Sequence, residues 1–345
     1  MRTRNAIVTL IGLIAGNAAV LPTAHAQTTQ TPASITSVSQ FYSDVAISTF
    51  NFSNGSAANA GYARYSTQSQ SVTFTSSGLV LPEYQYKIDS ERTLLIGLDL
   101  GYATATSTVT GTFAGSTSPN GVPLTSNAVT RETGTFRDVN VRLSLGYPIE
   151  LDDNLILTPR AGIGYMNEIS TRNRISIGSQ SLQNDRLDFN ADYLVSQVSL
   201  TLRYNLHYGE LDVSPAFSVE NIFAYTPNAS ITQTFAGGMP GARALGFTGW
   251  YDSMLYREGI EMTGPLHAKA FNHDLKWQTY LVANQAPGNV GLYHWAFEAG
   301  VAIGVNASDA KNLLFGFDPG DLFIGVAYVI GDHISGAKLN LGLRF

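Results

Sequence analysis

Alternation of apolar and polar residues is the dominant pattern of this chain. The last ten residues, 336–345, read GAKLNLGLRF, with an apolar side chain at every second position and a polar or small residue between. A period of two residues is that of a β-strand, whose successive side chains point to opposite faces. The same period recurs in segment after segment from residue 62 onward, and each segment is bounded by turn residues. The pattern therefore predicts an all-β protein made of antiparallel strands.

The alternating segments are joined in turn by short polar turns and by long polar stretches. Short turns are expected near residues 90, 150 and 208. Long loops, rich in Ser, Thr, Gly and Pro, are expected over 105–134, over 167–192 and near 245. The strands expected from the alternation are 62–75, 79–88, 94–102, 139–147, 155–165, 198–206, 211–225, 271–283, 290–305, 321–330 and 336–345.

The number of strands follows from parity. A single-chain membrane barrel has an even number of strands, with short turns at one end and longer loops at the other. If the C-terminus lies at the short-turn end, one more crossing has to be hidden within 226–270. We expect it at 255–263, with 242–251 as the alternative. The prediction is an antiparallel up-and-down transmembrane β-barrel of twelve strands, in which 306–320 lies at the short-turn end.

The first residues have the three parts of a secretory signal peptide. Arg2 and Arg4 form a basic start, residues 6–15 are apolar, and Ala24, His25 and Ala26 give a small-x-small cleavage site. The apolar run is too short for a membrane helix, which needs about 20 residues. We therefore predict a signal peptide at 1–26, an N-terminal segment at 27–61 and a barrel at 62–345.

The segment 27–61 allows two interpretations. Apolar residues recur at spacings of three and four, which favours a short amphipathic helix that enters the barrel lumen. The alternative is a disordered periplasmic leader. The apolar positions are Ile35, Val38, Phe41, Tyr42 and Val45.

Composition supports a membrane barrel. Only 13% of the residues are charged, 33 are glycine, 17 are tyrosine and none is cysteine. This composition fits a barrel with lipid outside and a polar, weakly charged interior. After removal of the signal peptide, 18 basic residues face 26 acidic ones, a net charge of −8, which argues against a nucleic-acid partner. Aromatic residues stand at the ends of the apolar faces of several predicted strands, and Tyr and Trp are enriched at membrane–water interfaces. These residues are Tyr102, Tyr147, Tyr165, Tyr204 and Trp295.

The polar faces of the predicted strands carry the candidate functional residues. Inside a barrel, such charges line a pore, hold a plug or pair with one another, and mutual pairing is the favoured interpretation because an unpaired buried charge is costly. The predicted lumen-lining residues are Asp99, Arg142, Arg160, Arg203, Glu298, Lys338 and Arg344.

Catalytic chemistry has one weak candidate. His294 is expected to face inward near the outer rim, with Glu298 four residues along on the same face. Metal-binding and phosphate-binding motifs are absent from the sequence, so no cofactor is expected. We predict a non-enzymatic protein, with two alternatives. One is an outer-membrane hydrolase of the lipase or protease kind that uses His294, and the other is an adhesion or receptor barrel that acts through the loops near 120, 180 and 245.

The final strand resembles the closing strand of Gram-negative outer-membrane β-barrels, whose C-terminal aromatic residue is part of the assembly signal. Leu341, Leu343 and Phe345 match that pattern. The barrel with its preceding segment resembles the translocator domain of autotransporters. Because only 35 residues separate the predicted signal peptide from the barrel, the chain is most similar to solitary barrels of this type that lack a passenger. The resemblance implies an outer-membrane channel or structural protein, with membrane lipids and the barrel-assembly machinery as partners and no catalytic residues.

Overall fold

The computed structural model of the 345-residue chain describes its strands and short turns. The chain divides into two compact units, Met1–Gln30 and Thr31–Phe345, and the first lies wholly outside the described residues. Among the described residues, no helix is long and apolar enough to cross a membrane. The signal peptide and the helix expected before the barrel fall outside the described residues and stay predictions. The described ranges are 58–66, 70–80, 84–89, 92–112, 129–177, 182–236, 243–270, 273–286, 294–306 and 321–343.

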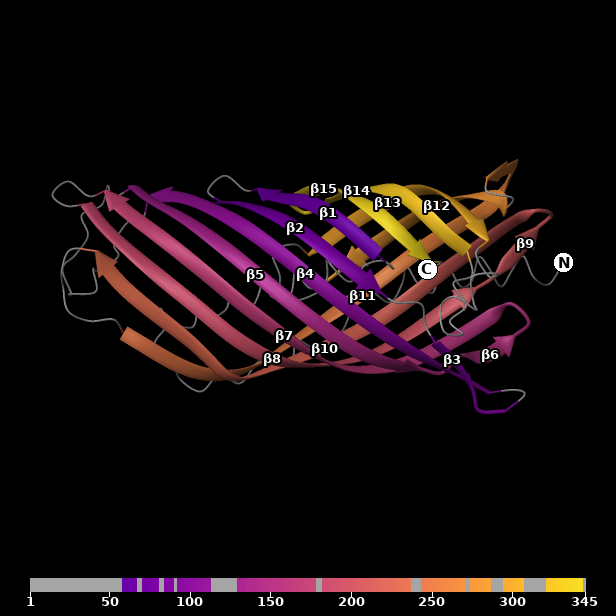
Figure 1. Ribbon diagram of the computed structural model, residues 1–345, viewed down its shortest axis with the longest axis horizontal. Coiled ribbons are helices and arrows are strands. Elements are labelled where there is room, and N and C mark those ends of the chain that lie inside the picture. The colour runs from indigo at the N-terminus through magenta and orange to yellow at the C-terminus, as the bar shows by residue number, and fades with distance from the viewer. Residues whose placement is uncertain are drawn as a thin grey trace. The chain divides into compact units, whose positions relative to one another are not determined.

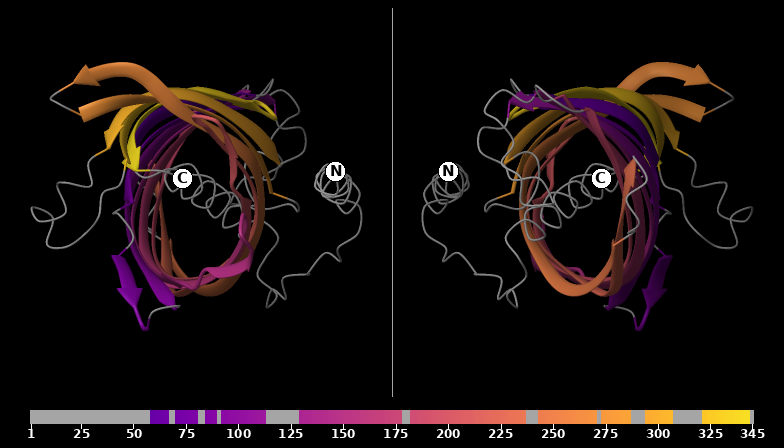
Figure 2. Two further views of the ribbon diagram at one scale, coloured as in Figure 1. Left: turned by 90° about the vertical axis from the view of Figure 1, so that its right-hand side faces the viewer. Right: turned by 90° about the vertical axis from the view of Figure 1, so that its left-hand side faces the viewer.

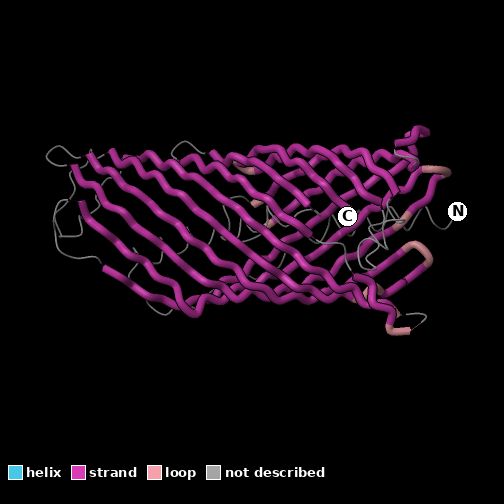
Figure 3. The backbone as a smooth tube through the Cα atoms, viewed as in Figure 1, coloured by secondary structure: helices cyan, strands magenta, loops and turns pink. Residues whose placement is uncertain are grey.

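Twelve long strands form a closed antiparallel barrel (Figures 1 and 2). Consecutive strands pair with each other, and the ring closes where the last strand pairs with the first. The described backbone contains strands and connecting turns throughout (Figure 3). The twelve are β1 (Ala58–Ser66), β2 (Gln70–Val80), β4 (Thr93–Thr112), β5 (Val129–Gly146), β7 (Leu155–Ile177), β8 (Leu182–Tyr204), β10 (Leu211–Ala236), β11 (Arg243–Ala270), β12 (His273–Gln285), β13 (Trp295–Asn306), β14 (Asp321–Gly331) and β15 (Ile334–Leu343).

Three short strands lengthen the barrel wall at one end. They follow β2, β5 and β8 and pair with β4, β7 and β10. The end that carries their tight turns is called the short-turn end below, and β15 also finishes there. In the third of these turns Gly209 has φ of 63°, a left-handed conformation that glycine adopts without steric cost. The short strands are β3 (Tyr84–Lys87), β6 (Ile149–Asp152) and β9 (Leu206–Tyr208).

The predicted number of twelve strands is confirmed, but the first two strands were placed wrongly. Residues 62–75 were expected to form one strand and instead form the β1–β2 hairpin, in which Tyr65 pairs with Val72. The segment 79–88 is not a separate crossing, because β2 ends at Val80 and β3 follows. The hairpin turn lies in a run of Ser, Thr and Gln, whose polar side chains fit a strand as well as a turn.

The three long loops were largely mispredicted, because much of their sequence is strand. β4 and β5 continue into the expected loop at 105–134, and β7 and β8 occupy most of 167–192. The hidden crossing is the single strand β11, which contains nearly all of both candidate segments, 242–251 and 255–263. As a result β4, β5, β7, β8 and β10 reach well beyond the shorter strands β1, β2 and β12 to β15 (Figure 1).

Polar pairs hold the extended part of β7 and β8 together on the outer face. Asn167 donates a hydrogen bond of 2.8 Å to Asp192, its direct neighbour across the two strands. Thr171 likewise donates one of 2.9 Å to Asp188. Tyr165 also donates to Asp192. Cross-strand pairs of this kind stabilise a sheet without apolar residues. They explain why the strands continue where apolar alternation stops.

An apolar belt surrounds the barrel. Its side chains point outward and are exposed, as Ile163 at 68% and Val301 at 58% illustrate. A closed wall pairs its backbone groups internally, which is what a chain in hydrocarbon requires. Tyr102 and Tyr165, expected at strand ends, lie within β4 and β7 and mark one edge of the belt. The belt includes Leu100, Val141, Leu143, Leu145, Leu194, Val198, Leu200, Ile303, Ile324 and Val326.

Candidate functional site in the barrel lumen

Charged side chains gather on the inner face of the barrel. In each strand they occupy the positions between the exposed apolar residues and are buried or half-buried. Six of the seven residues predicted to line the lumen lie here, and Arg344 lies outside the described residues. The six are Asp99 on β4, Arg142 on β5, Arg160 on β7, Arg203 on β8, Glu298 on β13 and Lys338 on β15.

One group of these charges forms an arginine network across five strands. Arg142 donates a hydrogen bond of 2.6 Å from Nε to Asp99, its partner across β4 and β5. Its other end donates to Gln197 and lies 3.6 Å from Glu220. Arg257 approaches the second oxygen of Glu220 at 3.6 Å. The side chains of Asp99 and Glu220 are only 6% and 7% exposed, so each carboxylate has its compensating charge within the wall.

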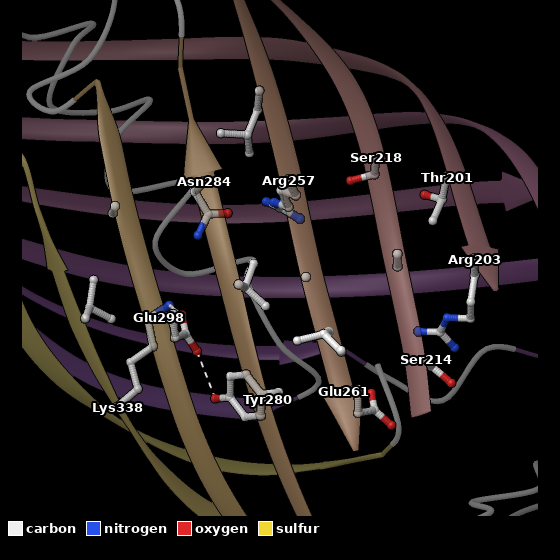
Figure 4. A pocket seen from close by; sticks show the side chains of 17 residues that line it. Thr201, Arg203, Ser214, Ser218, Arg257, Glu261, Tyr280, Asn284, Glu298 and Lys338 are labelled. Carbon is white, nitrogen blue, oxygen red and sulfur yellow. Dashed lines mark hydrogen bonds and ion pairs between the residues drawn. The ribbon is translucent and has the colours of Figure 1, made fainter. Parts of the chain in front are cut away.

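A second group lies on β12, β13 and β15. Lys338 Nζ is 2.8 Å from Glu298 Oε2, and both side chains are less than a tenth exposed. Tyr280 donates a hydrogen bond of 2.9 Å to the other oxygen of Glu298 (Figure 4). Asn340 Nδ2 in turn donates to the Tyr280 hydroxyl at 2.5 Å. The Tyr280 ring fits only because residue 300 is glycine, since a Cβ there would lie 2.3 Å from Tyr280 Cζ. This group is called the Glu298 cluster below.

A cavity of about 210 Å³ lies between the two groups. Its walls come from β8 and from β10 to β15, and charges of both signs face it (Figure 4). Arg203, Arg257 and Lys338 contribute positive charge, and Glu261 and Glu298 contribute negative charge. The space is far larger than the roughly 10–15 Å³ that one water molecule needs. The lumen can therefore hold several waters or a small polar solute beside charged groups.

The remaining predicted residues have less prominent positions. Arg160 donates a long hydrogen bond of 3.4 Å to Ser144, and Arg203 borders the cavity. His294 is exposed just before β13, at the end opposite the short turns. Glu298, the proposed companion of His294, instead accepts hydrogen bonds from Tyr280 and Lys338.

Sequence reasoning missed several buried charges of the lumen. Asp138 lies one residue before the strand expected at 139–147, although the inward alternation of β5 continues from Arg142 back to it. Glu168 fell in the loop expected over 167–192 and lies on β7. Glu220 and Arg257 lie on β10 and β11, and the sequence pattern did not show which residues of these two strands face inward. Within the described ranges, no group of three or more His, Cys, Asp or Glu side chains is arranged to hold a metal ion.

Comparison with known proteins identifies the fold. No protein-family model and no curated protein matches the chain. Among solved structures, the chain is similar to the translocator domain of the autotransporter NalP from Neisseria meningitidis, with a TM-score of 0.51 and 10% identity over 90% of this chain and 98% of that one. It is also similar to the beta domain of the Bordetella autotransporter BrkA, with a TM-score of 0.50 and 14% identity over 84% of this chain and 97% of that one. Identities this low show a shared fold alone. The chain has the β-barrel fold of autotransporter translocator domains.

Proposed function

We propose that this protein is a non-enzymatic outer-membrane β-barrel that acts as a channel for small polar solutes or ions. The observation that carries the proposal is the lumenal cavity of about 210 Å³, bordered by charged side chains of both signs. Channels of this class combine an apolar exterior with a polar interior. The apolar belt supports contact with membrane lipids, and the likeness in fold to translocator barrels supports an outer-membrane location.

We propose further that the residues before β1 restrict this channel. Between the predicted signal peptide and Ala58, the start of β1, lie 31 residues. Even with every residue helical, a segment of that length would span about 45 Å, enough to pass through a membrane barrel. Its single charged residue is Asp44, so the segment enters a polar lumen with little desolvation cost.

Conductance in a planar bilayer tests both proposals. The mature chain and a variant without residues 27–57 are refolded and compared. We expect small or rare current steps from the mature chain and larger steps from the truncated one. If neither form conducts, the barrel is a structural membrane protein and the channel proposal fails. If both conduct equally, the restriction by residues 27–57 fails.

Ion selectivity provides a second test with a matched control. Arg257→Gln removes a positive charge beside the cavity, and Arg137→Gln removes one from the exposed outer face of β5. We expect Arg257→Gln to shift the reversal potential in a salt gradient toward cation preference, because the remaining wall charge is more negative. Arg137→Gln is expected to leave the potential unchanged. Equal shifts in the two variants would mean that ions do not pass the cavity.

The barrel-assembly machinery is the proposed partner of the C-terminal strand. Leu339 of β15 is 51% exposed on the outer face, and Leu341 and Leu343 continue its alternation. We expect Phe345→Ala to lower the fraction of heat-modifiable, folded barrel in cells, whereas Leu339→Ala should have little effect. Similar levels of folded barrel for Phe345→Ala and the unaltered protein would contradict the proposal.

A further inference from the structure

Buried polar atoms without hydrogen-bond partners are concentrated in one patch of the inner wall. Among the described residues, eleven buried side-chain N or O atoms lack a partner, and seven of them belong to β2, β5 and β7. They are both oxygens of Asp138, both amide atoms of Asn140, Oε1 of Glu168, and the hydroxyls of Ser170 and Ser76. So many unmet groups in one place indicate a missing ligand, since buried polar groups are normally paired.

Two carboxylates form the centre of this patch. Asp138 and Glu168 are direct partners across β5 and β7 and are 3% and 1% exposed. Side chains so placed have Cβ atoms about 4.5–5.5 Å apart. Asn140 and Ser170 lie two residues from this pair on the same face of the wall, at 3% and 2% exposure. Because β5 and β7 are antiparallel, the two flank the pair on opposite sides, Asn140 opposite Met166 and Ser170 opposite Phe136. The two carboxylates therefore meet side by side on neighbouring strands, and the amide and the hydroxyl flank them along the wall.

Among the described residues, no basic side chain forms an ion pair with either carboxylate. Their neighbours in the row are Ala103 and Ala191, whose side chains have no donor. The backbones of Arg142 and Arg172 lie four residues along β5 and β7, about 13 Å from those of the carboxylates at a strand rise of about 3.3 Å per residue. Arg142 is already bound to Asp99. Within the described ranges, the donor to this pair is the Tyr193 hydroxyl, which donates a hydrogen bond of 3.2 Å to Glu168 Oε2.

The N-terminal segment does not supply the missing charge either. Residues 27–57 contain no lysine, arginine or histidine. Two buried carboxylates side by side repel each other and lose their hydration, a combination that a protein tolerates only with a compensating charge or a proton.

We propose that this patch binds a hard divalent cation of the calcium type, held by the carboxylates of Asp138 and Glu168. Every available donor atom but one is oxygen, which suits Ca²⁺ and excludes softer metals. Two carboxylates balance the charge of a divalent ion. Calcium also accepts about six to eight oxygens in flexible geometry, so a wall of two strands can contribute part of its shell and waters the rest. The ion stabilises the extended half of the β5–β7 wall.

Calcium binding to the refolded full chain tests the proposal. The protein in detergent micelles is stripped with EDTA and titrated with CaCl₂ by calorimetry, and its thermal unfolding midpoint is measured with and without calcium. The test variant is Asp138→Asn with Glu168→Gln. The matched control is Asp152→Asn with Asp153→Asn, which removes two consecutive acidic residues from an exposed turn at the short-turn end.

We expect one calcium ion per chain and a higher unfolding midpoint with calcium for the unaltered protein and for the control. The test variant should bind calcium about tenfold or more weakly, because both anionic ligands are lost. It should still fold, since the change removes two repelling charges. If the unaltered protein binds no calcium, or if the test variant and the unaltered protein bind it equally, the proposal is wrong. A midpoint that rises in the test variant regardless of calcium would indicate a shared proton instead of an ion.

Discussion

Loss of Lys338 should destabilise the barrel more than any other single charge removal near the cavity. Lys338 and Glu298 are 2.8 Å apart, with side chains 4% and 8% exposed. The substitution Lys338→Met keeps the length of the side chain and removes its charge. It leaves the Glu298 carboxylate buried, still accepting the hydrogen bond of 2.9 Å from the neutral Tyr280 hydroxyl (Figure 4).

The expected cost is about 3 kcal/mol of unfolding free energy. Breaking a buried ion pair on one side costs roughly 3–5 kcal/mol, because the other charge is left uncompensated. The charge-assisted bond from Tyr280, worth about 1.5–3 kcal/mol, persists and places the cost at the lower end. Adding Glu298→Leu removes the orphaned charge, so the double variant should regain most of the loss.

Denaturant unfolding in micelles, followed by tryptophan fluorescence, measures these differences. The matched control is Lys269→Met, because Lys269 forms an exposed pair with Asp274 at 3.4 Å, with side chains 69% and 76% exposed. An exposed pair contributes no more than about 1 kcal/mol. If Lys338→Met costs no more than Lys269→Met, the Glu298 cluster is solvated and the buried-pair argument is wrong.

Two further substitutions test the wall itself. Val301→Arg puts a charge in the apolar belt and should lower the unfolding free energy in lipid vesicles by about 2–4 kcal/mol. Thr106→Arg, on an exposed site of β4 beyond the belt, is the control and should be tolerated. Equal unfolding free energies in the two variants would contradict the position of the belt. Gly336→Ala would put a Cβ 2.2 Å from the Tyr62 carbonyl oxygen at the β1–β15 seam and should cost about 1–3 kcal/mol. Gly146→Ala, whose Cβ would have 3.5 Å to its nearest neighbour, is the control, and matching denaturation midpoints would argue against a tight seam.

Alternation predicted the membrane-crossing part of the fold because two solvents act on the two faces. Leu100 faces lipid and Asp99 faces the lumen, so neighbouring residues must differ in polarity for the length of the crossing. A tilted strand needs only about 9–11 residues to cross. The assignment of inner and outer faces therefore followed from the sequence. The count of twelve was right because two errors offset each other: the expected strand 62–75 is two strands, and the expected crossing 79–88 is none.

The extended ends of the strands were invisible to the same reasoning. Beyond the belt both faces are polar, so strand and loop have the same composition. Asn167 and Asp192 are typical loop residues by type, and they belong to strands only because they bond to each other across the sheet. Their pairing depends on the register of two segments separated in sequence, which a single-chain pattern does not contain.

The lumenal charges illustrate the same limit at the level of the site. The sequence placed Glu298 and Lys338 on inner faces, yet their strands are not neighbours, because β14 lies between them. The residue of β14 beside Lys338 is Ala327, and the residue of β13 beside Ala327 is Gly300. These small residues leave room for the lysine to reach Glu298 and for the Tyr280 ring to lie beside it. Small inward residues thus decide which long side chains meet. The sequence shows each small residue, and only the register shows which contact it permits.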